Sequence, residues 1–153
     1  MLSKGEWSEM NRERLAKADI YYKRCDSIAD KIKAVKSLSP KNIYTLEVYE
    51  QVNKLAQFGP KALLALNVYD MAQSSQQESD ALKKIQQLQG EFNDLREQFE
   101  EVYGKTRILS KPEDYILDQD YHVHLANQAI SFDWQFYAEI LFLEKINSFY
   151  GAD

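Results

Sequence analysis

The sequence contains little cysteine, glycine or proline. Its single cysteine, Cys25, excludes an internal disulfide and a zinc site of paired cysteines, and its place in an apolar pattern indicates a core residue. With 5 glycines and 3 prolines among 153 residues, a loop-rich β protein and a long disordered tail are both disfavoured. The sequence as a whole is 44% hydrophobic and 28% charged, the composition of a globular chain long enough to bury a core.

Excess positive charge and long apolar runs are also missing. The formal net charge is −5 and the Lys and Arg residues are interspersed with acids, so we expect no nucleic-acid partner. There is no run of about 18 apolar residues, the length that spans a bilayer, and the N-terminus lacks the apolar core of a signal peptide. We therefore expect a soluble chain without a membrane span, although a trimmed piece of a secreted protein would have the same character.

Apolar side chains recur at steps of three and four residues over most of the chain, which is the spacing of one helix face. The predicted fold class is all-α, an up-and-down bundle of four to five helices that forms a single domain over residues 1–153. An irregular aromatic loop at 105–130 is expected to cross the bundle before the last helix. The predicted helices lie at about 8–37, 41–58, 60–73, 79–103 and 132–149.

Two of these helices carry the clearest patterns. The first has an apolar stripe of Met10, Arg14, Ala18, Tyr21, Tyr22, Cys25, Ile28, Ala29, Ile32 and Val35. The fourth has a heptad seam of Ala81, Ile85, Leu88, Phe92, Leu95, Phe99 and Val102. Ahead of that seam, Ser75 and Glu78 match a capping box. Gly59-Pro60 is either a turn or a kink, and this choice decides between four and five helices.

The stretch from Lys111 to Tyr150 holds both histidines and the densest aromatic run, so a functional site is expected there first. Four potential metal ligands stand at every second residue of it, namely Asp118, Asp120, His122 and His124. On an extended strand they would share one face and could hold a divalent cation. On a helix they would splay apart, and surface or capping roles are the preferred interpretation. We therefore assign no metal site and keep the metal reading as an alternative.

No motif for catalysis or for a cofactor is present. The sequence has no glycine-rich phosphate loop and no HExxH. The Glu-x-x-His pair of a di-iron bundle is also missing, because Gln119 stands three residues before His122. We assign no catalytic residue and no cofactor. A metal-dependent enzyme built on Asp118 to His124 is the least favoured hypothesis.

Aromatic side chains cluster in the same stretch, namely Tyr115, Tyr121, Phe132, Trp134, Phe136 and Tyr137. Such a cluster can form a sugar-stacking platform, but clustered rings more often lie in a core or at an interface between domains. The candidates for an interface or a sugar-stacking site are Tyr115, Tyr121, Trp134 and Tyr137.

The passage Leu95 to Arg107, LREQFEEVYGKTR, is followed by Lys111-Pro112 and by the segment from Asp118 to Trp134. Together they resemble the helical region after the catalytic barrel in some bacterial family 20 glycoside hydrolases, the exo-β-N-acetylhexosaminidases. The resemblance covers at most the second half of the chain. It implies a non-catalytic helical module beside a barrel that removes terminal N-acetylhexosamine, in a periplasmic or secreted bacterial protein. The family's catalytic Asp-Glu pair has no match, because no Asp is directly followed by Glu here.

Two further hypotheses about function remain. The first is an accessory or interaction domain, whose partner is a neighbouring catalytic domain of the same polypeptide or a separate protein. The resemblance implies a carbohydrate-active enzyme as the parent. The second is a freestanding helical adaptor or oligomerisation module that uses the seam from Ala81 to Val102. Under both hypotheses the chain by itself is not an enzyme.

Overall fold

The computed structural model of the protein describes residues 3–38, 41–106 and 136–150. These residues form five helices and contain no strand, which confirms the predicted all-α class. The helices are α1 (Glu6–Met10), α2 (Arg12–Leu38), α3 (Ile43–Asp70), α4 (Ser75–Gly104) and α6 (Tyr137–Tyr150). Among the helices of the described residues, none is both long and apolar enough to cross a membrane. The predicted crossing loop lies, apart from its first two residues, outside this part of the chain.

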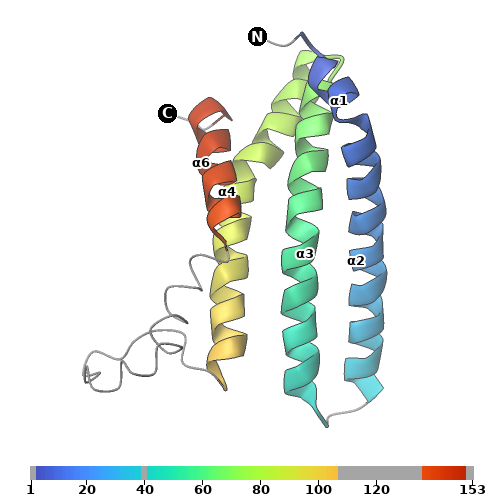
Figure 1. Cartoon of the computed structure of the whole chain (residues 1–153), viewed down its shortest axis with the longest axis vertical. Coiled ribbons are helices and arrows are strands. Elements are labelled where there is room, and N and C mark those ends of the chain that lie inside the picture. Colours follow the sequence, from blue (N-terminus) through green and yellow to red (C-terminus); the bar gives the residue numbers. More distant parts are fainter. Residues whose placement is uncertain (1–2, 39–40, 107–135, 151–153) are drawn as a thin grey trace, which may run out of the picture.

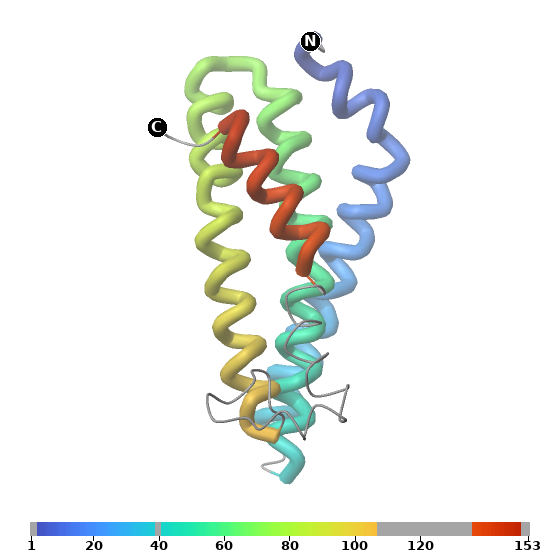
Figure 2. The backbone as a smooth tube through the Cα atoms, turned by 60° about the vertical axis from the view of Figure 1, so that its left-hand side comes forward, coloured from blue at the N-terminus to red at the C-terminus, as the bar shows by residue number. Residues whose placement is uncertain are grey.

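The long helices run up and down beside one another, as Figure 1 shows. α2 packs against α3, and α3 packs against α4. α6 lies against α4, and Figure 2 shows it running obliquely over the half of the bundle that contains the connection from α3 to α4. The short α1 sits at that same end and contacts α3 and α2.

The hydrophobic core lies where α3, α4 and α6 meet. Its buried members are Phe58, Ala62, Ile85, Leu88, Phe92, Phe99, Phe136, Leu143 and Ile146. The Phe92 ring is central to it, with ring centroids 5.0 Å from Phe58 and 5.7 Å from Phe136. The predicted seam of α4 is confirmed, but it is buried inside one chain. Because this seam packs within one chain, an adaptor or oligomerisation function would have to use another surface.

Gly59-Pro60 does not end a helix. Pro60 lies inside α3, which runs unbroken through both residues. An internal proline costs about 3 kcal/mol because it removes a hydrogen bond to the carbonyl four residues earlier. Here the affected carbonyl belongs to Ala56, which is exposed to water, and the adjoining turns bury Phe58 and Ala62 in the core. The predicted helices at 41–58 and 60–73 are therefore a single helix.

The predicted stripe of the first helix is correct on one side only. Of the predicted stripe, Ala18, Cys25 and Ile32 are buried in α2, which also buries Leu15. Tyr21, Ile28 and Val35 of α2 are exposed, as is Met10, which belongs to α1. Within the described residues the one long helix packed on α2 is α3, so α2 buries a single narrow seam. Burial raises the pKa of the Cys25 thiol, and the charge of Asp26 adds to this effect. Cys25 is the core residue that the sequence predicts.

Two predicted helix starts are displaced. The N-cap of α4 is Ser74 and not Ser75, with the Ser74 Oγ accepting from the Gln77 N–H at 3.3 Å. Gln77 replaces Glu78 as the reciprocal residue, because its Oε1 accepts from the Gln73 N–H at 2.8 Å. The helix predicted from residue 41 begins at Ile43, after the N-cap Asn42, which has a left-handed backbone with φ 64°.

Candidate functional site

A concave surface lies at the end of the bundle where α1, α3, α4 and α6 come together. Its volume is about 800 Å³, within the range of roughly 300–1,000 Å³ that is usual for ligand sites. We call it the end groove. Its lining residues are Ser3, Lys4, Trp7, Leu66, Tyr69, Asp70, Glu78, Phe142, Lys145, Ile146, Phe149 and Tyr150.

One wall of the end groove is a row of side chains on α6. Phe142, Ile146 and Phe149 are spaced by four and three residues, so they share one face of the helix. Ile146 is buried in the core, whereas Phe149 is 73% exposed. The wall is joined to α3 by Tyr150, whose ring packs edge-on against Tyr69 at 5.1 Å. The α6 wall is therefore anchored in the core at its inner edge and open to water at its outer edge.

The opposite wall is the segment from Ser3 to Trp7, which Asp70 fixes to the end of α3. The Asp70 Oδ1 accepts a hydrogen bond from the Gly5 N–H at 3.1 Å. Its Oδ2 accepts from the Ser8 N–H at 2.9 Å and from the Ser8 hydroxyl at 2.6 Å. Gly5 has φ 83°, a left-handed conformation that suits glycine, and this turn brings Trp7 to the groove.

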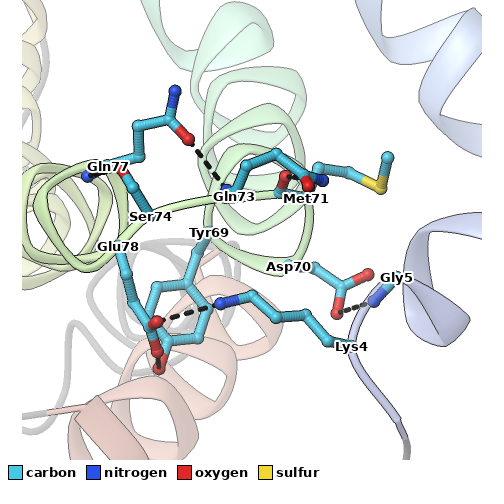
Figure 3. A network of polar contacts seen from close by, with 9 residues as sticks. All are labelled: Lys4, Gly5, Tyr69, Asp70, Met71, Gln73, Ser74, Gln77 and Glu78. Atoms are coloured by element: carbon cyan, nitrogen blue, oxygen red, sulfur yellow. Dashed lines mark hydrogen bonds and ion pairs between the residues drawn. The ribbon is translucent and has the colours of Figure 1, made fainter.

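A second polar link closes the end of this wall. Figure 3 shows Lys4 reaching across to Glu78 at the start of α4, with 2.9 Å between the Lys4 Nζ and the Glu78 Oε2. The Tyr69 hydroxyl donates to the other oxygen of Glu78 at 3.3 Å. Residues from the N-terminus, from α3 and from α4 are thus joined at one point.

The acidic groups of the end groove remain ionised at neutral pH. Burial acts to raise the pKa of Asp70, but the hydrogen bonds from Ser8 and Gly5 together outweigh it and hold that pKa below its ordinary value. The hydrogen bond and charge of Lys4 lower the pKa of Glu78. Burial, with the neighbouring Glu78 charge, raises the pKa of Tyr69. These groups are therefore suited to holding the walls together and unsuited to donating or accepting protons near pH 7.

Lys145 is the exception among the charged residues of the groove. In the described structure its ammonium makes no ion pair and lies 5.7 Å from the centre of the Phe149 ring. It is therefore a solvent-exposed cation at the edge of an apolar surface, available to an acidic group of a ligand.

The site residues predicted from sequence are mostly outside the part of the chain that the structure describes. This applies to Asp118, Asp120, His122 and His124, and equally to Tyr115, Tyr121 and Trp134. Tyr137 begins α6, is 53% exposed and does not line the end groove. Across residues 3–38, 41–106 and 136–150, no three His, Cys, Asp or Glu side chains are grouped as metal ligands.

The end groove is not predictable from the pattern of the sequence. Its two walls are far apart in the chain, and the Asp70 to Ser8 contact spans 62 residues. Helical spacing places Phe142, Ile146 and Phe149 on one face, but it does not separate a buried face from one that is half open. Trp7, a lone aromatic residue in a polar N-terminal segment, was the one available signal.

No protein-family model matches this sequence, and neither the curated proteins nor the solved structures give a significant match.

Proposed function

We propose that this chain is a non-catalytic binding module that holds an apolar helical segment of a partner protein in the end groove. The observation that carries the proposal is the exposed ring of Phe149 on the rim of a concave surface lined by aromatic side chains. Large aromatic rings are frequent anchors in protein interfaces, where a partner covers them and removes them from water.

A helix suits the shape of the groove. Phe142, Ile146 and Phe149 follow one another along α6, so they can contact apolar residues placed at i, i+3 or i+4, and i+7 of a partner helix. Lys145 lies beside this row and can pair with an acidic residue at the edge of the partner. The expected ligand is therefore an amphipathic helix with one acidic flank.

The polar groups of the groove support a role without catalysis. Asp70 accepts three hydrogen bonds from the N-terminal segment, and Glu78 is engaged by Lys4 and Tyr69. Both carboxylates serve as structural acceptors with lowered pKa values. The resemblance to the helical region of a β-N-acetylhexosaminidase also implies a non-catalytic module, but the sugar-active parent rests on that resemblance alone.

The test is a selection of helical peptides against the purified chain from a display library. We expect the selected peptides to share apolar residues at helical spacing and to compete with one another for one site. Phe149→Asp should weaken their binding by tenfold or more, because a charge replaces the exposed anchor. The matched control is Leu38→Asp, which changes a leucine that is 82% exposed at the far end of α2.

Far-UV circular dichroism of both variants should match that of the parent chain, since neither residue is buried. The proposal fails if selection yields no peptide, or if the peptides bind the Phe149→Asp variant as tightly as the parent chain.

A further inference from the structure

We propose a second binding surface, on the side of α2 that α3 leaves open, for an acidic amphipathic helix of a partner protein. This inference goes beyond the end groove and does not depend on it. We call the surface the outer seam. It consists of Lys17, Tyr21, Arg24, Ile28, Lys31 and Val35.

The spacing of the outer seam is that of a helix packed along another helix. Its six residues follow one another at alternate steps of four and three, and basic and apolar side chains alternate. Tyr21, Ile28 and Val35 are 55%, 45% and 46% exposed. α2 thus has two seams with the same period, and α3 covers only one of them. A helix with two such seams is suited to lie between two neighbours.

The contact between α2 and α3 fixes where the outer seam lies. The Asn53 Nδ2 donates to the Cys25 carbonyl at 2.8 Å, so these two residues face each other. Gln57 and Asp26 are hydrogen bonded at 2.6 Å, and both lie to the same side of that facing pair. The outer seam lies on the other side, where neither residue reaches.

α3 adds apolar surface to the outer seam. Tyr49 stands four residues before Asn53, and Ile28 stands three residues after Cys25. In a pair of antiparallel helices these positions fall on the same side of the contact. Tyr49 is 61% exposed and its neighbour Val52 is 47% exposed. The open apolar surface therefore extends over both helices.

Charge indicates the kind of partner. Within the described residues, Lys17, Arg24 and Lys31 make no ion pair, and the Arg24 guanidinium lies 5.8 Å from the centre of the Tyr21 ring. The acids Asp19 and Asp26 lie away from the outer seam, paired with Lys23 and Gln57. Three exposed cations in one row, in a chain of net charge −5, are complementary to a row of acids.

Two other occupants fit less well. A second copy of the chain that used the same face would oppose one basic row to another, which costs free energy. Helices that lie on membranes separate a wide apolar face from a basic face. In the outer seam the two kinds of side chain alternate along one row.

An acidic helix that covers Lys17 to Val35 needs a length of about 27 Å, at 1.5 Å per residue.

The experiment uses two synthetic helical peptides of three heptads and the full chain. Both peptides have leucines along one seam, and the flanking positions are Glu in one and Lys in its twin. Titration calorimetry should detect binding of the Glu peptide only, weakening as salt is raised. Ile28→Asp and Arg24→Glu should each weaken binding by at least tenfold. Val68→Asp, an apolar residue of α3 that is 50% exposed, is the matched control and should change binding less than twofold.

The Glu peptide also has the character expected of the end-groove ligand, so the titration is repeated in a Phe149→Asp background that removes the end-groove anchor. The Glu peptide should still bind there, and Ile28→Asp should still weaken that binding at least tenfold, which separates this inference from the proposed function. The inference is overturned if neither peptide binds, if the Lys twin binds equally, or if Ile28→Asp has no effect. It is also overturned if Ile28 mediates adsorption to phosphatidylserine vesicles or dimerisation of the chain while the Glu peptide does not bind.

Discussion

At the scale of single residues, Asp70 determines where the N-terminal segment lies. It is the last residue of α3, yet it satisfies three donors that belong to residues 5 and 8. Hydrogen bonds to a charged acceptor contribute about 1.5–3 kcal/mol each when buried, and less here because Asp70 is partly exposed. One carboxylate therefore holds a wall of the end groove in place.

We predict that Asp70→Ala releases residues 3–10 without unfolding the bundle. The loss of two or three hydrogen bonds should cost roughly 1–3 kcal/mol locally. Hydrogen exchange should then become about ten- to a hundredfold faster at the amides of Glu9 and Asn11, which bond within this segment. Asp80→Ala, which removes an exposed carboxylate from α4, is the control and should leave those two amides unchanged.

Acid should release the same segment. Because the folded pKa of Asp70 lies below its ordinary value near 4, its charge stabilises the docked segment above about pH 4, and this contribution is lost as the pH falls through the folded pKa. The fluorescence of Trp7, read in a Trp134→Phe background, should report the change before circular dichroism does. The measurement is made in a Glu78→Gln background, because Glu78 is a second group of the groove with a lowered pKa. A transition that persists when Asp70→Asn is added would show that another group controls it.

At the scale of helices, the sequence predicts the spacing of apolar residues better than it predicts which of them are buried and where each helix ends. The seam of α4 is predicted correctly because seven apolar residues repeat without a break. The stripe of α2 is predicted too wide, since the sequence does not show that α3 is the one long helix packed on α2 among the described helices. Pro60 within α3 is also not predictable from propensity, because packing of Phe58 and Ala62 overrides the local cost.

Two glycines should respond in opposite ways to the same change. Gly90 lies inside α4, and a methyl group there would meet no atom within 4 Å. Gly90→Ala should therefore stabilise the protein by about 0.5–1 kcal/mol. Gly5 has φ +83°, so Gly5→Ala should strain the turn by about 1–2 kcal/mol and loosen the N-terminal segment. Chemical denaturation measures the first effect and hydrogen exchange measures the second.

At the scale of the whole molecule, apolar residues serve two purposes. One set is buried in the core between α3, α4 and α6. The other set includes large side chains of the end groove and the outer seam that are exposed to water. Periodicity alone does not separate these sets, because both have the spacing of a helix face. The candidate site was for this reason not predictable from sequence, although the fold class was.

The two sets should differ in their effect on stability. Leu88 is 1% exposed, so Leu88→Asp places a charge in the core and should cost more than about 3 kcal/mol, enough to unfold much of the chain. Phe149→Asp and Leu38→Asp should each change the free energy of unfolding by less than about 1 kcal/mol. Urea denaturation of the three variants compares them. If Phe149→Asp lowered the free energy of unfolding as much as Leu88→Asp does, Phe149 would belong to the core.

The most direct measurement is a chemical-shift map of the chain titrated with a peptide selected against the end groove. We predict that the indole N–H of Trp7 and the amides around Phe142 and Phe149 shift together and saturate together. Signals of Tyr21 and Ile28, on the outer seam, should not move with this peptide. If the peptide shifts residues elsewhere on the bundle and leaves Trp7 and Phe149 unchanged, the end groove is not the binding site.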